Sequence, residues 1–168
     1  MDQAITNRDD SQLELDRISE IAEDVLRRCR AQGASEVDVG IGVDVGLSVS
    51  VRLGEVESIE HHRDRGLSLT VYFGKRKGSA STADLNPDSI GKTIEHACDI
   101  ARYTEEDPCN GLADADLLAH EFADLDLWHP WDITTEEATE LALRCEQAGR
   151  DFDPRISNSE GATVQIGS

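Results

Sequence analysis

Residues 36–53 read EVDVGIGVDVGLSVSVRL, and every odd-numbered position from 37 to 53 carries Val, Ile or Leu. A spacing of two is the period with which side chains alternate between the faces of a β-strand. A second run of this kind, LSLTVYF, occupies residues 67–73. Strict alternation gives a strand one apolar and one polar face, which is typical of antiparallel sheets that have one side in water. Residues 36–82 are therefore predicted to form an antiparallel sheet.

Glycine-containing turn signals divide this region into four or five strands. They stand at residues 45–46, 54–55, 64–66 and 74–75. The stretch 55–62 is expected to be a weaker strand, and 75–82 a polar one. With helical patterns on either side, the sequence predicts an α+β fold: an antiparallel four- to five-stranded meander with helices packed on one face.

The first helix is predicted over residues 12–31, with Gly33 placed to end it. Its apolar residues recur at three- and four-residue steps, which puts them on one stripe: Leu15, Ile18, Ala22, Val25 and Cys29. A second helix is predicted to begin at Asn86 and Pro87, because Asn is a good N-cap and Pro at the first helical position forfeits no hydrogen bond. Its stripe is formed by Ile90, Ile94, Ala97 and Ala101.

A capping box formed by Thr134 and Glu137 predicts the start of a third helix. Its buried side is expected to consist of Ala138, Leu141, Cys145 and Ala148. Before it, residues 104–132 show little periodicity and are longer than most loops. We expect this segment to be held in place by the packing of its large apolar side chains, Leu117, Leu118, Phe122, Leu125, Leu127 and Trp128.

The chain has 16 basic and 35 acidic residues, a formal net charge of −19. This balance disfavours binding to nucleic acid and to anionic membranes, since both attract Lys and Arg. Residues 104–126 alone hold eight acidic residues and neither Lys nor Arg. Such acidity is typical of a solvated surface, but it is also compatible with an acidic face that meets a basic partner.

The chain termini and the cysteines suggest a reduced, cytoplasmic protein. There is no apolar run of about 18 residues that could span a membrane. Residues 1–11 are polar, without the apolar core of a secretory signal, and are interpreted as a disordered lead-in. The four cysteines form no CxxC pair and are expected to be unpaired thiols: Cys29, Cys98, Cys109 and Cys145.

The histidines do not show metal-ligand spacing. His120-Glu121 is not part of an HExxH motif, because position 124 is Asp and the next histidine is His129. Adjacent His61 and His62 would point to opposite faces of a strand. The segment GKRKG, residues 74–78, lacks the order of a phosphate-binding loop and is expected to be a hairpin tip. The sequence therefore assigns no catalytic, cofactor-binding or metal-binding residue.

Residues 154–168 are interpreted as the start of a second domain that follows an α+β domain over residues 12–153. The alternation of Ala162, Val164 and Ile166 indicates a strand with a buried face. Its buried face and pairing neighbour are expected to come from the following domain. In this chain the strand has three options: it folds back on the sheet, it pairs with another copy, which its open apolar edge favours, or it frays.

Several stretches resemble the N-terminal region of the PmbA/TldD family, and its PmbA-like (TldE-like) branch more than its TldD-like branch. The stretches are GLSVSVRLGEVE (46–57), VY (71–72), RKGSAST (76–82), DIARYT (99–104), DPC (107–109), LAD (112–114), DLDL (124–127), HP (129–130) and RISNSEG (155–161). They occur in the family's order and extend over nearly the whole chain after about residue 12.

This resemblance implies the N-terminal domain of a longer cytoplasmic protein. It implies a heterodimer with a TldD-like subunit that acts as a zinc metallopeptidase on unfolded peptides, with roles in microcin maturation and antitoxin turnover. The family's zinc is held by an HExxxH motif in the TldD-like partner, and no position here matches that motif. The resemblance therefore implies a chain that is inactive alone and serves as a scaffold and for peptide admission. A second hypothesis is an acidic protein-binding module, a DNA mimic that modulates DNA gyrase.

Overall fold

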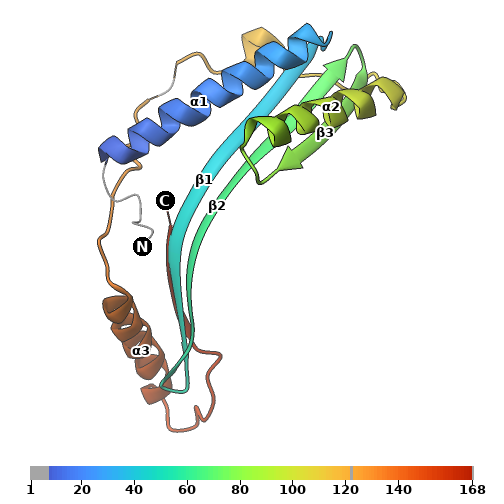
Figure 1. The fold of residues 1–168 in the computed structure, drawn as a ribbon. Coiled ribbons are helices and arrows are strands. Elements are labelled where there is room, and N and C mark those ends of the chain that lie inside the picture. The colour runs from blue at the N-terminus through green and yellow to red at the C-terminus, as the bar shows by residue number, and fades with distance from the viewer. Residues whose placement is uncertain (1–7, 122, 168) are drawn as a thin grey trace. The chain divides into compact units, whose positions relative to one another are not determined.

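The computed structural model describes residues 8–121 and 123–167 and contains an open four-stranded antiparallel sheet with the strand order β3-β2-β1-β4 (Figure 1). The helices are α1 (Arg8–Ala31), α2 (Pro87–Tyr103) and α3 (Thr135–Asp151), with a short 3-10 helix η1 (Ala115–Leu117). The strands are β1 (Glu36–Arg52), β2 (Glu55–Phe73), β3 (Arg76–Thr82) and β4 (Ala162–Gly167). The predicted α+β class and antiparallel sheet are confirmed.

The described chain forms two compact units. The α1/α2 unit consists of residues 11–43 and 65–127, and the α3 unit consists, among the described residues, of 8–10, 44–64 and 128–167. Strands β1 and β2 contribute one stretch to each unit, so each unit has its own part of the sheet.

Two of the predicted turns are wrong, because β1 and β2 each continue through them. Residues 45–46 lie inside β1 and residues 64–66 inside β2. Gly46 is needed for close packing instead: a Cβ there would lie 2.6 Å from Nε2 of His62 and 2.7 Å from the carbonyl oxygen of Ile166. A glycine within an alternating run can mark such a close approach as well as a turn. The meander therefore has three strands, and β4 supplies the fourth.

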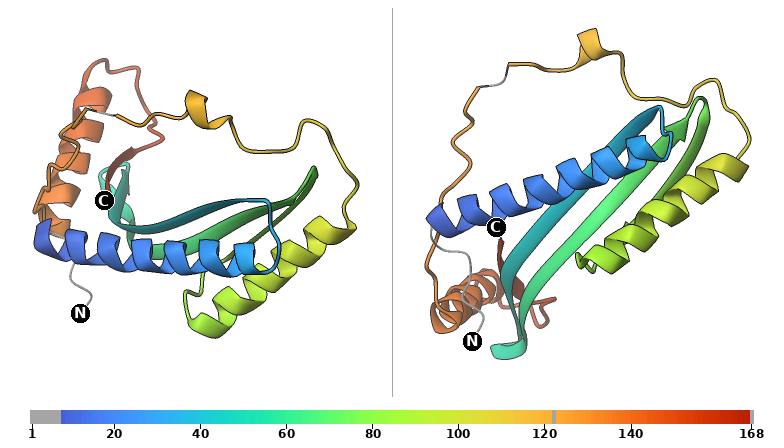
Figure 2. Two further views of the ribbon diagram at one scale, coloured as in Figure 1. Left: turned by 90° about the horizontal axis from the view of Figure 1, so that it is seen from above. Right: turned by 45° about the horizontal axis from the view of Figure 1, so that its top comes forward.

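The core of the α1/α2 unit lies between its two helices and one face of the sheet, as predicted. The helices lie on the same side of the strands (Figure 2). Buried residues include Val25 and Cys29 of α1, Val37 of β1, the strand set Leu67, Leu69 and Val71, and the α2 set Ile90, Ile94, Ala97, Cys98 and Ala101. The stripe predicted for α2 is confirmed, and Asn86 accepts a hydrogen bond from the Ser89 amide as its N-cap.

Helix α1 differs from the prediction at its N-terminal end. It begins at Arg8 and not at Gln12, and Leu15 is half-exposed and does not belong to the core. The remainder of the predicted lead-in, residues 1–7, lies outside the described residues.

The α3 unit buries Val49 and Val51 of β1 against Ala138 and Ala142 of α3, with Ala162 and Val164 of β4 packed beside them. Strand β4 pairs antiparallel with β1, from Gly46 opposite Gly167 to Val51 opposite Ala162. Of the three outcomes considered for this strand, the structure shows the one in which it folds back on the sheet, and not the pairing with another copy that its open edge was expected to favour. Sequence alternation showed that residues 162–166 need a neighbour, but it did not reveal that β1 still has a free edge there.

The packing of α2 on β3 depends on Gly78. A Cβ at this position would collide with the carbonyl oxygen of Ala97 and lie 2.5 Å from the amide nitrogen of Ala101, both on the α2 backbone. Since helix and strand backbone cannot move as easily as a side-chain tip, Gly78→Ala should destabilise the chain by about 1–3 kcal/mol. Urea unfolding followed by circular dichroism measures this.

Gly42→Ala is the matched control for this effect, because a Cβ on Gly42 meets nothing within 4 Å. It should be neutral or slightly stabilising, since alanine has less freedom to lose in a strand. Equal effects of the two substitutions would contradict close α2–β3 packing as the reason for Gly78.

Candidate functional site

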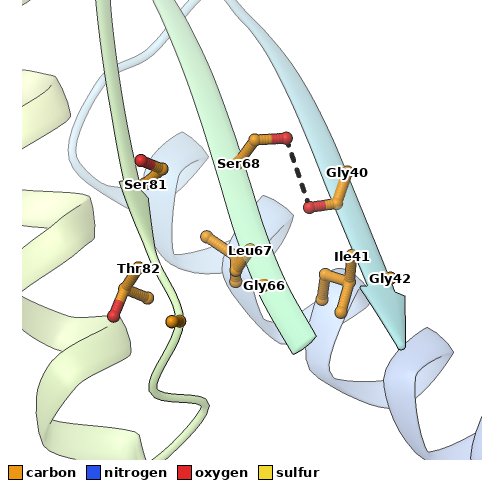
Figure 3. A pocket seen from close by; sticks show the side chains of 9 residues that line it. Gly40, Ile41, Gly42, Gly66, Leu67, Ser68, Ser81 and Thr82 are labelled. Atoms are coloured by element: carbon orange, nitrogen blue, oxygen red, sulfur yellow. Dashed lines mark hydrogen bonds between the residues drawn. The ribbon is translucent and has the colours of Figure 1, made fainter. Parts of the chain in front are cut away.

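A hollow lies on the sheet of the α1/α2 unit, near the position where β3 ends (Figure 3). Its volume is about 540 Å³. It is lined by the strand residues Gly40, Ile41, Gly42, Gly66, Leu67, Ser68, Ser81 and Thr82, together with Ala83. The only hydrogen bond drawn within this set runs from the Ser68 hydroxyl to the Gly40 carbonyl oxygen, at 3.4 Å.

The floor of the hollow belongs to the face of the sheet that points away from α1 and α2. Leu67 and Leu69 are buried in the helix-covered core, so the intervening Ser68 points to the opposite side. A Cβ on Gly40 would lie 2.8 Å from the Ser68 hydroxyl oxygen, which places Gly40 on the same side. Ser81 is the cross-strand partner of Ser68. Helical residues do not contribute to the lining.

The lining combines glycine backbone and hydroxyl groups with three apolar residues, Ile41, Leu67 and Ala83. Glycine leaves the strand backbone uncovered, so another backbone can approach it closely. The hydroxyl groups of Ser68 and Ser81 can both donate and accept hydrogen bonds. Thr82 is the cross-strand partner of Leu67, and its hydroxyl group donates to the Asp84 carbonyl at 3.3 Å and accepts from the Asp84 amide at 3.1 Å. The lining has no charged side chain and no histidine or cysteine. Such a surface suits binding of an uncharged, extended chain better than acid–base chemistry.

A second notable site is the tip of the β1–β2 hairpin, in the α3 unit. The two turn residues, Leu53 and Gly54, have φ angles of 53° and 83°. Positive φ at both positions is the geometry of a type I′ turn, which usually carries Asn or Gly. A leucine in this left-handed region costs roughly 1–2 kcal/mol. Contacts with the rest of the chain must therefore stabilise this turn conformation, because Leu53 by itself disfavours it.

Glu146 of α3 supplies that hold. Its two carboxylate oxygens accept hydrogen bonds from the Leu53 amide at 2.7 Å and the Gly54 amide at 2.8 Å. The residue is only 4% exposed. Burial alone would raise the pKa of Glu146, but the Gly54 and Leu53 amides, the Ser159 hydroxyl and the charge of Arg150 together lower it below the ordinary value. Glu146 thus remains a carboxylate that connects α3 with the hairpin.

Sequence reasoning missed Glu146. The buried side of α3 is Ala138, Ala142 and Glu146, whereas the prediction was Ala138, Leu141, Cys145 and Ala148. Cys145 and Ala148 are exposed. The apolar pattern excluded a charged residue from the core stripe, although Glu146 follows Ala138 and Ala142 at helical steps of four. The predicted capping box of Thr134 and Glu137 is present, with both hydrogen bonds formed.

Each of the histidines considered in the sequence analysis has its own local surroundings. His62 shares a 2.7 Å hydrogen bond with Asp44, His61 is exposed, and a ring nitrogen of His120 lies 3.0 Å from the Ala115 carbonyl oxygen. Across residues 8–121 and 123–167, no three His, Cys, Asp or Glu side chains gather as metal ligands. The residues present therefore do not fit a zinc ion, and no catalytic step is assigned to one.

The segment 74–78 is a hairpin tip, as predicted. Gly74 and Lys75 join β2 to β3, with Phe73 opposite Arg76. The tip is tied to the following loop, since the Lys75 ammonium donates to the Asn110 carbonyl at 2.7 Å and the Asn110 side chain donates to the Lys75 carbonyl at 3.1 Å.

The acidic segment, residues 104–132, does not have the apolar packing that the sequence analysis predicted. Leu117, Leu118, Leu125 and Leu127 are between 53% and 81% exposed, and Trp128 is half-buried. Phe122 lies outside the described residues. Backbone hydrogen bonds at η1 and at the Asp107 turn give the segment local order without a buried face.

Two models of one family match the chain: PmbA/TldA metallopeptidase domain 1 over residues 36–101, and the PmbA/TldA metallopeptidase central domain over residues 128–168. The chain therefore belongs to the PmbA/TldD metallopeptidase family. The acidic residues 104–126 lie between the two matched regions.

The similar curated proteins are on the PmbA side of this family. The chain is 50% identical to Metalloprotease PmbA of Escherichia coli O157:H7 over 134 residues, 79% of this chain and 30% of that protein. It is 49% identical to a Metalloprotease PmbA homolog of Haemophilus influenzae over 131 residues, 78% of this chain and 29% of that protein. The chain thus spans about a third or less of the length of these relatives.

Solved structures share the fold. A Bacteroides thetaiotaomicron protein named as a candidate modulator of DNA gyrase superposes with a TM-score of 0.74 at 22% identity, over 90% of this chain and 33% of that one. TldE from Thermococcus kodakarensis gives 0.63 at 16% identity, over 88% and 36%. None of the helices in residues 8–121 and 123–167 is long and apolar enough to cross a membrane.

The four cysteines are free thiols, as predicted, and they differ in environment. Cys29 and Cys98 are buried. Burial raises the pKa of Cys29 to about 11, with a further contribution from neighbouring Cys98, and burial also raises that of Cys98. Only the thiolate reacts readily.

In native protein at pH 8, iodoacetamide should therefore alkylate Cys109 and Cys145 before the buried pair Cys29 and Cys98, and peptide mass spectrometry over time measures the order. Equal labelling of all four would contradict the buried pair.

The lowered pKa of Glu146 predicts how the α3 unit responds to acid. The carboxylate contributes stability fully above its unfolded pKa, ordinarily 4.5, and this contribution is lost as pH falls through the lower folded value. Glu146→Gln should reduce stability at neutral pH and make the difference from wild type shrink as pH falls below about 4. Urea unfolding followed by Trp fluorescence is suitable, since both tryptophans, Trp128 and Trp131, belong to this unit.

Glu140→Gln is the control, because Glu140 is an exposed residue on the same helix. It should leave stability and its pH dependence close to wild type. If the two variants behave alike at every pH, the hydrogen bonds to Leu53 and Gly54 do not stabilise the hairpin.

Proposed function

We propose that this chain is a non-catalytic part of a PmbA-like subunit that receives unfolded peptide for a metallopeptidase. The observation that carries the proposal is the hollow on the sheet of the α1/α2 unit, whose lining combines uncovered glycine backbone, serine hydroxyl groups and a few apolar residues. A peptide in extended conformation can lie against such a floor and be recognised through its backbone, which suits substrates of varied sequence. Membership of the PmbA/TldD family supports a peptide as the ligand.

We further propose that the two subunits have different roles, with the metal site in the partner. Its sequence has no HExxxH motif, and its described residues form no cluster of metal ligands. We propose that zinc and the peptide-cleaving chemistry belong to a TldD-like partner subunit, that the two subunits form a heterodimer, and that this chain contributes scaffold and peptide admission. Residues 12–153 would form the N-terminal domain and residues 154–168 the start of the next. Free thiols at all four cysteines fit a cytoplasmic location.

The gyrase-directed alternative gains less support. A protein that mimics DNA needs carboxylates in regular rows, comparable to phosphates along a duplex. Within the described part of residues 104–134, regular structure is limited to η1, so the acidic side chains of this segment have no helical or strand periodicity. Co-purification with a TldD-like protein, followed by a zinc-dependent peptidase assay on an unfolded substrate, would separate the two hypotheses. Capture of gyrase in place of a TldD-like protein would favour the alternative.

Gly42→Phe tests the hollow directly. A Cβ on Gly42 has open space around it, so the ring should enter the hollow without disturbing the strand. We expect affinity for a fluorescein-labelled, reduced and carboxymethylated peptide without stable structure to fall about tenfold, equivalent to about 1.4 kcal/mol. Fluorescence anisotropy measures the binding, and circular dichroism checks the fold.

Gly149→Phe is the matched control, since a Cβ on Gly149 in α3 also meets nothing within 4 Å. This variant adds the same ring to the α3 unit and should bind peptide as wild type does. Unchanged binding by a folded Gly42→Phe variant would refute the hollow as the peptide site. It would not bear on the TldD-like partner, which the co-purification tests separately.

A further inference from the structure

The two buried thiols, Cys29 of α1 and Cys98 of α2, lie next to each other in the core of the α1/α2 unit. Both are fully buried and belong to the same apolar cluster. Their side chains interact directly, since the Cys29 thiol donates a hydrogen bond to the Cys98 sulfur. Neither residue lines the hollow, so the pair is independent of the proposed peptide binding.

The two helices are held together on both sides of this pair. Toward the C-terminal ends of the helices, Nη2 of Arg102 donates a hydrogen bond to the Gln32 carbonyl oxygen at 3.3 Å. Toward the N-terminal end of α2, the Arg28 guanidinium lies beside Gly91, where a Cβ would be 3.1 Å from Nη2. In each helix the cysteine lies between these two contacts along the sequence. A disulfide requires Cα atoms about 4.4–6.8 Å apart and side chains directed toward each other. Two facing thiols between such contacts have the arrangement that this bond requires.

The two thiols differ in how readily they ionise. Burial raises the pKa of both, so both are protonated at neutral pH. Each also has a guanidinium nearby that opposes the effect of burial, Arg28 for Cys29 and Arg102 for Cys98. The hydrogen bond between the thiols makes the difference, because it raises the pKa of the donor, Cys29, and lowers that of the acceptor, Cys98. Cys98 is therefore the sulfur that forms a thiolate first.

We propose that Cys29 and Cys98 are a site of reversible oxidation, at which a hydroperoxide converts the two thiols into a disulfide that joins α1 to α2. The Cys98 thiolate attacks one oxygen of the hydroperoxide, the O–O bond breaks, and the leaving oxygen takes up a proton and departs as water or an alcohol. Cys98 is then a sulfenic acid. The Cys29 sulfur attacks it, an S–S bond forms, the S–O bond breaks, and the hydroxyl group leaves as water with the Cys29 proton. The two thiols thus lose two electrons, which reduce the O–O bond.

The surroundings of the pair favour a disulfide over further oxidation. A sulfenic acid on Cys98 has Cys29 beside it, and burial makes a second encounter with peroxide slower than condensation with that thiol. The new bond closes a loop of about 70 residues that contains β1, β2 and β3. Because a cross-link restricts the unfolded chain, oxidation should stabilise this protein.

Formation of the bond is tested in the 168-residue chain with the exposed Cys109 and Cys145 replaced by serine. This variant is treated with hydrogen peroxide without denaturant, alkylated with N-ethylmaleimide in urea, and digested without reduction. Mass spectrometry should show the Cys29 and Cys98 peptides joined, in a monomeric protein whose mass is lower by two hydrogen atoms. Dithiothreitol should reverse the change.

Urea unfolding followed by circular dichroism measures the effect on stability. The unfolding equilibrium constant of the oxidised form should be about a hundredfold smaller than that of the reduced form, as expected for a cross-link over a loop of this length. Cys98→Ser in the same background is the matched control, because it cannot form the bond. Peroxide should leave its unfolding curve unchanged. Each variant is compared with itself before and after treatment, so the test holds even where serine lowers stability.

The order of the two steps has a separate readout. In Cys29→Ser, the sulfenic acid on Cys98 has no thiol beside it and should be captured by dimedone. Cys98→Ser retains the less acidic thiol and should give a much smaller dimedone adduct on Cys29 under the same conditions. Equal adducts in the two variants would show that Cys98 is not the sulfur that reacts first.

Two results would overturn the proposal as a whole. One is that Cys29 and Cys98 remain free thiols after a peroxide treatment that fully oxidises Cys109 in the unsubstituted chain. The other is a joined form that unfolds at the same or a lower urea concentration than the reduced form, because the native helix packing would then not accommodate the bond.

Discussion

The hydrogen-bonded pairing of β1 with β2 is the constraint on which both units depend. These strands have 17 and 19 residues, far more than the usual length of a strand. A two-stranded ribbon is only marginally stable in water by itself. Each stretch of the ribbon is accordingly covered by a helix layer and extended by a third strand. In one unit these are α1, α2 and β3, and in the other they are α3 and β4.

The two third strands also decide which surfaces stay open. Strand β3 pairs with only part of β2 and β4 pairs with only part of β1, so each long strand keeps an unpaired stretch. The hollow lies where β3 ends. The position of this hollow thus follows from the mismatch between long central strands and short outer ones.

Glu146 shows how a charged residue can serve the core. Its carboxylate gives the backbone amides of a strained turn the acceptors that they would otherwise find in water. The acidic segment between the family's two matched regions has the opposite character, since its leucines remain exposed and its order is local.

The sequence by itself determined the antiparallel α+β class, the α2 stripe, the α3 capping box and the turn at residues 74–75. All of these depend on neighbours within a few residues, where side-chain period, capping and turn chemistry act. The tertiary structure decided the rest. Position 46 is a glycine because His62 and Ile166 occupy the space that a side chain would need. Position 78 is a glycine because the α2 backbone lies directly against β3 there. Glu146 is buried because two distant amides need its oxygens, and residues 162–167 form a strand because β1 has a free edge at that place. Contacts of this kind join residues far apart in the chain, and no local pattern in a single sequence records them.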